Sequence, residues 1–114
     1  MDVRADGIKT FDIAVATGNI PEGISSGILV CPSEMAVELA KRGSFAQVIT
    51  AGSHSHDTVT FSSDTGDKMV VCFQRTIVTA MGKAVLPDEV IIERAEDRER
   101  DMLSAAVMRC MGLV

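Results

Sequence analysis

Apolar and polar positions alternate along the chain in segments that predict strands and helices in turn. Residues 8–16 show period-two alternation, which is typical of a half-buried strand. Residues 28–31 form a short continuous apolar run, as in a strand covered on both faces, and residues 47–51 predict the next strand. A proline, a capping serine and an acid begin a helix over 33–43, where apolar residues recur at helical spacing. Strand, helix and strand in this order predict a βαβ unit with two parallel strands.

The pattern changes after residue 58. Two short strands, 59–61 and 69–73, flank a segment rich in turn residues, which predicts a β-hairpin. A further strand is expected at 89–93. The last element is a helix over 95–111, with one apolar face and Gly112 after its end. Its charged first half, with mixed signs, is expected to face solvent.

These elements predict an α/β (α+β-like) fold in a single globular domain over residues 1–114. The expected architecture is a two-layer sandwich. It combines a mixed sheet of about five or six strands, one βαβ unit, one β-hairpin and two main helices, including the C-terminal helix. Two helices leave one face of such a sheet partly covered, and association into a homodimer would bury the rest.

Composition and charge narrow the classes of partner. Sixteen acidic and eleven basic residues give a net charge of −5, which disfavours binding to nucleic acid. No apolar run approaches the roughly 20 residues that span a bilayer, and the polar start has no signal-peptide core, so neither a membrane nor secretion is expected. The three cysteines, Cys31, Cys72 and Cys110, are widely spaced among apolar neighbours, which predicts free thiols and a cytoplasmic location.

The βαβ unit predicts where a site would lie. Cys31 and Gly52 end its two parallel strands, so the loops that follow should emerge at the same, carboxyl-terminal edge of the sheet. Ligands of open α/β sheets bind at this edge. Hydroxyl and amide donors of Ser33, Ser53 and Ser55 could hold a small anionic molecule there. The alternative for these serines is ordinary loop and cap chemistry.

Both histidines of the chain lie in the loop expected at this edge of the sheet, next to an acidic residue. In an extended segment His54 and His56 point the same way, and Asp57 supplies a carboxylate, so the three can bind a divalent metal such as zinc. The run from His54 to Asp57 resembles part of the HxHxDH ligand loop of the metallo-β-lactamase family. Here one spacer is missing before the acid and the closing histidine is absent. The alternative is a polar surface loop whose side chains satisfy turn hydrogen bonds.

Cys31 is the one candidate for a catalytic residue. It precedes a helix N-terminus, where free amides favour the thiolate and lower the pKa. The stretch from Val30 to Glu34 resembles the V-C-P-T/S-E sequence around the peroxidatic cysteine of peroxiredoxins. Where that family has a threonine and a proline before the cysteine, this chain has Ile28 and Ile24. The alternative is a buried, inert cysteine that ends a core strand.

Two functional hypotheses from different classes follow. The leading one is a small-ligand-binding or subunit-interaction protein, with any ligand at the carboxyl edge of the parallel strands. The other is an enzyme at the same edge, dependent either on a metal held by His54, His56 and Asp57 or on the thiol of Cys31. The sequence predicts no particular substrate or reaction for either.

Overall fold

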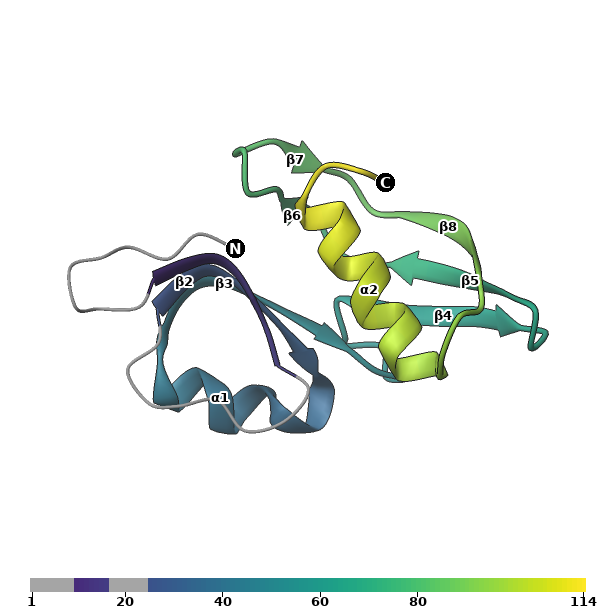
Figure 1. The fold of residues 1–114 in the computed structure, drawn as a ribbon, viewed down its shortest axis with the longest axis horizontal. Helices are drawn as coiled ribbons and strands as arrows, with labels where there is room; N and C mark the ends of the chain where they lie inside the picture. Colours follow the sequence, from purple (N-terminus) through teal and green to yellow (C-terminus); the bar gives the residue numbers. More distant parts are fainter. Residues whose placement is uncertain (1–9, 17–24) are drawn as a thin grey trace.

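The computed structural model describes residues 10–16 and 25–114 (Figure 1). It contains a six-stranded mixed sheet, a separate two-stranded sheet and two main helices. This is the α/β sandwich that the sequence predicts, with its βαβ unit, its hairpin and its C-terminal helix. The predicted strand at 8–16 is described from Thr10 onward, and residues 17–24 lie outside the described part.

The sheet has the strand order β1-β2-β3-β4-β5-β8. Neighbours from β1 to β4 are parallel, and β5 is antiparallel to both β4 and β8. The strands are β1 (Thr10–Val15), β2 (Ser25–Pro32), β3 (Ser44–Ala51), β4 (Val59–Asp64), β5 (Lys68–Phe73) and β8 (Asp88–Glu93). The small second sheet pairs β6 (Ile77–Val78) with β7 (Ala84–Val85).

The βαβ unit consists of β2, a single 3-10 turn η1 (Ser33–Met35), the helix α1 (Ala36–Arg42) and β3. Alternate residues of β2 face opposite sides of the sheet. Leu29 packs with Leu39 of α1 on one side, whereas Val30 belongs to the core beneath the C-terminal helix α2 (Arg98–Cys110) on the other. The two helices therefore cover opposite faces of the sheet, whereas the expected two-layer sandwich would place both on one face. This arrangement explains why residues 28–31 are apolar without interruption.

The parallel and antiparallel halves of the sheet meet at a single pair of residues, Ala51 and Val59. Strand β4 begins where β3 ends and runs onward beyond it (Figure 1). The seven intervening residues, 52–58, form a loop that leaves and re-enters the sheet at this junction, closed by the amide of Gly52 donating to the carbonyl of Val59 at 3.1 Å. The histidines thus lie where the two halves of the sheet join.

Helix α2 begins three residues later than the sequence indicates. Asp97 caps it by accepting a hydrogen bond from the amide of Arg100, and Gly112 follows its end with a φ of 79°. The prediction that its charged start faces solvent is wrong at Asp101, which is buried and paired with Arg94 at 2.8 Å. Its partner Arg94 and two donating amides, those of Ala95 and Glu96, precede the helix, so helical periodicity alone does not reveal that this acid is buried. None of the described helices is long and apolar enough to cross a membrane.

Candidate functional site

The ends of β2 and β3 lie side by side. Cys31 pairs with Thr50 and Pro32 with Ala51, so the η1 turn and the Gly52 loop emerge at the same edge, as the βαβ unit predicts. Strand β1 is also parallel to β2. The residues that follow it, 17–19, lie outside the described part of the chain.

Asp57 is the centre of this edge. Its side chain is 0% exposed, although it follows two exposed histidines in a surface loop. Oδ2 accepts a hydrogen bond from the amide of His54 at 3.0 Å, and the amide of Asp57 donates to the carbonyl of His54 at 3.1 Å. These two bonds fold the loop back on itself, so that the acid lies beneath the histidines.

The surroundings of Asp57 favour its charged form. Burial raises the pKa of this carboxyl, but the neighbouring Ser33 hydroxyl, the His54 amide that donates to Oδ2, the neighbouring Thr50 hydroxyl and the charge of His56 together lower the pKa by more. The net pKa therefore lies below its ordinary value of 3.8. Asp57 is a buried carboxylate anion at neutral pH.

The two imidazoles lie over this anion. Nδ1 of His54 is 3.6 Å from Asp57 Oδ2, and Nε2 of His56 is 4.0 Å from Asp57 Oδ1. The rings stack with centroids 5.1 Å apart and planes 16° from parallel. One ligand atom from each of the three residues lies within 4.8 Å of the other two. The structure thus brings together the three residues that the sequence names as metal ligands.

One oxygen of the buried carboxylate is left without a donor. Among the described residues, Oδ1 of Asp57 has no hydrogen-bond partner. An unpaired buried acceptor costs roughly 1–3 kcal/mol, and more when it is charged. A cation bound between this oxygen and the two exposed imidazoles would supply the missing partner.

Two of the three predicted ligand-binding serines line the same hollow, and the third does not. Ser33 and Ser53 line a hollow of about 240 Å³, together with His54 and, from α2, Arg98 and Glu99. Burial first, and then the charges of Glu34 and Asp97, raise the pKa of Glu99. Ser55 is exposed in the loop and is not one of the residues that line this hollow.

Cys31 lies in the core beneath α1 and not in the hollow. Its residue is 0% exposed, in a cluster that includes Leu29 and Leu39. Burial, and then the negative charge of Glu34, raise the pKa of its thiol to about 11. This shift is opposite to the lowering expected from the helix start. The helix begins as a short 3-10 turn, and desolvation of the thiolate dominates.

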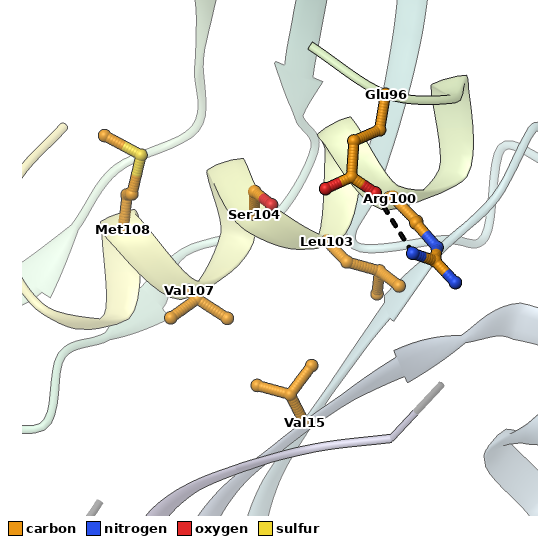
Figure 2. Close-up of a pocket in the computed structure, with 7 residues that line it drawn as sticks. All are labelled: Val15, Glu96, Arg100, Leu103, Ser104, Val107 and Met108. Carbon is orange, nitrogen blue, oxygen red and sulfur yellow. Dashed lines mark hydrogen bonds and ion pairs between the residues drawn. The ribbon is translucent and has the colours of Figure 1, made fainter. Parts of the chain in front are cut away.

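A larger hollow, of about 440 Å³, lies between α2 and the end of β1. Figure 2 shows Leu103 and Val107 of α2 on the side facing Val15, with the Glu96–Arg100 ion pair at one end. None of the candidate site residues contributes to it. Its lining contains no cysteine or histidine, and its one carboxylate, from Glu96, is paired with Arg100.

Sequence reasoning placed Gly52 at this edge but missed its role there, and it missed Thr50 and Gln74 altogether. Gly52 makes room for the Asp57 carboxylate, Thr50 contributes a hydroxyl to it, and Gln74 contacts the loop backbone. The hairpin register contains a signal for Gln74. Strands β4 and β5 are antiparallel and Phe73 pairs with Val59, so Gln74 must lie opposite Thr58, at the end of the histidine loop.

Comparison with protein-family models, with curated protein sequences and with solved structures finds no match for this chain.

Proposed function

We propose that the protein binds one divalent metal ion, with zinc the first choice, through His54, His56 and Asp57. The observation that carries the proposal is the fully buried Oδ1 of Asp57, which has no hydrogen-bond partner in the described part of the chain and lies beside the two imidazoles. Nitrogen and oxygen ligands of these types are the ones zinc takes in proteins. The exposed rings can turn toward one ion at small cost, because each imidazole is about two-thirds exposed.

Three protein ligands leave a coordination position open. Closed structural zinc sites use four protein ligands, whereas sites that act on a bound molecule use three and leave the fourth to water or substrate. His54 lines the adjoining hollow of about 240 Å³, with the hydroxyls of Ser33 and Ser53 close by. The same edge would then hold a small molecule beside the ion, which joins the small-ligand and metal-dependent hypotheses in one site.

Elemental analysis of the full chain, purified without chelators and after zinc loading and gel filtration, tests this proposal. The wild type should retain about one metal per chain, and His54→Ala and His56→Ala should each lose it. Ser55→Ala is the matched control, because it changes the same loop without removing a ligand. A wild type that retains no metal would refute the proposal.

A second proposal concerns association. Three exposed apolar side chains, Met81, Leu86 and Met111, line one hollow of about 630 Å³ beside the end of α2, and Met81 is 89% exposed. We propose that a second copy of the chain covers this surface, since an apolar patch with a polar rim marks an association site. Sedimentation should show a homodimer that Met81→Lys converts to monomer. A wild type that stays monomeric at high concentration would contradict it.

A cytoplasmic location remains part of the proposal. It is supported by Cys31, Cys72 and Cys110, which are all free thiols.

A further inference from the structure

The backbone of the histidine loop is held from outside the loop. Two consecutive residues after β5, Gln74 and Arg75, donate hydrogen bonds to its carbonyl oxygens. Nε2 of Gln74 makes one short bond, 2.7 Å to Asp57 O, and two longer ones, 3.3 Å to His54 O and 3.4 Å to Ser55 O. The Gln74 amide donates to Thr58 O at 2.8 Å.

Arg75 supplies the remaining contact. Its Nη2 donates to the carbonyl of His56 at 3.1 Å. All five carbonyls from His54 to Thr58 therefore lie within hydrogen-bond distance of a donor of Gln74 or Arg75, and the two N–H groups of the Gln74 side chain are shared among three of them. A loop whose carbonyls are held from one direction has its backbone conformation fixed, although its histidine side chains stay exposed.

We infer that Gln74 is the positioning residue of the metal site, an inference that rests on the proposed metal binding. Its side-chain amide contacts neither imidazole and is not a ligand. It sets the backbone of His54 and Asp57 so that their ligand atoms meet before an ion arrives. Outer residues that orient metal ligands in this way raise affinity by preorganisation, and removing them costs 10- to 100-fold in metal binding.

The chain offers a matched control in Gln47. Its side chain also bonds to backbone in another element: Nε2 donates to Val78 O at 2.8 Å, and Oε1 accepts from the Val78 amide at 3.1 Å. Gln47 thus stabilises β6 as Gln74 stabilises the loop, but it contacts no part of the histidine segment. An effect of general destabilisation would appear in both positions.

Zinc titration by calorimetry, on the full chain, compares the wild type with Gln74→Glu and Gln47→Glu. Gln74→Glu keeps the shape but replaces the donor by an acceptor that faces three carbonyls, so zinc should bind roughly 10- to 100-fold more weakly. Gln47→Glu should bind zinc within about twofold of the wild type, the range expected for a residue remote from the ligands. If Gln74→Glu fails to fold, Gln74→Asn, which keeps the amide but falls one methylene short, should show the same loss.

The outcomes separate the two proposals. A wild type that binds no zinc removes the proposed function, and the positioning role with it. A wild type that binds zinc with both Gln74 variants unchanged overturns the positioning role alone, and so does an equal loss in Gln47→Glu. In metal-free protein, the NMR signals of the His54 and His56 rings should shift in Gln74→Glu and stay in place in Gln47→Glu. Ring signals that do not shift in Gln74→Glu would also count against the inference.

Discussion

Gly52 and Asp57 share one space at the end of β3. A Cβ at position 52 would overlap Oδ2 of Asp57 and stand 3.0 Å from Cβ of Ser33. The backbone of Gly52 and the carboxylate of Asp57 are therefore in direct contact, and a fully buried acid fits here because position 52 carries no side chain. This close approach is the structural basis for a ligand group placed below a surface loop.

Gly52→Ala should therefore disturb both fold and site. Neither the carboxylate nor the backbone beside it can move aside easily, so the variant is expected to lose about 1–3 kcal/mol in its free energy of unfolding. Urea denaturation measures this loss. Ser53→Ala, at the exposed neighbouring position, is the control and should stay within experimental error. Equal stability of Gly52→Ala and the wild type would show that the loop adjusts freely.

Acid should unfold the protein over a defined range of pH. The Gly66 amide, followed by the guanidinium groups of Arg98 and Arg94, lowers the pKa of Asp64 from 3.8 to about 2. Because the folded pKa is depressed, the stabilisation is complete above about pH 4 and is lost as pH falls from 3.8 toward 2. Asp57 shifts in the same direction and should add to the loss.

The measurement is the urea midpoint between pH 6 and pH 2.5. Asp64→Asn should flatten the fall in stability below pH 4, because its side chain does not titrate, whereas Asp67→Asn in the neighbouring turn should leave the curve unchanged. A steep fall that is identical in Asp64→Asn would assign the acid sensitivity to other carboxyls.

The three thiols should react in a fixed order. Burial raises the pKa of Cys31 and of Cys110 to about 11, so little thiolate forms at neutral pH and reagents have no direct access. Cys72, which is half-buried, should react first with a thiol reagent at pH 7.5. All three should react rapidly in urea. Fast labelling of Cys31 below pH 7 in the folded protein would restore it as a candidate catalytic group.

The sequence predicts most of the fold because its periodicities are local. The βαβ unit, the hairpin and the C-terminal helix each follow from residues close together in the chain, and the shared edge follows from the parallel strands. The face of the sheet on which each helix lies is a tertiary property. Residues 28–31 are apolar on both sides, so their pattern cannot distinguish Cys31 beneath α1 from Val30 beneath α2.

The candidate site divides in the same way. His54, His56 and Asp57 are close in sequence, so their residue types suffice to name them, but the burial of Asp57 depends on partners that lie elsewhere. Ser33 and Thr50 belong to other elements, and Gln74 returns to the loop through the hairpin. Asp101 shows the same limit, since its partner Arg94 precedes the helix and is also paired with Asp64.

The most direct test of the metal site is a crystal structure of the full chain grown with zinc, with anomalous data collected at the zinc edge. The account predicts one strong peak at the Gly52 loop, about 2.0–2.2 Å from a nitrogen of each of His54 and His56 and from Oδ1 of Asp57. A loop with no peak, or a peak bound elsewhere while Oδ1 of Asp57 is satisfied by water alone, would contradict it.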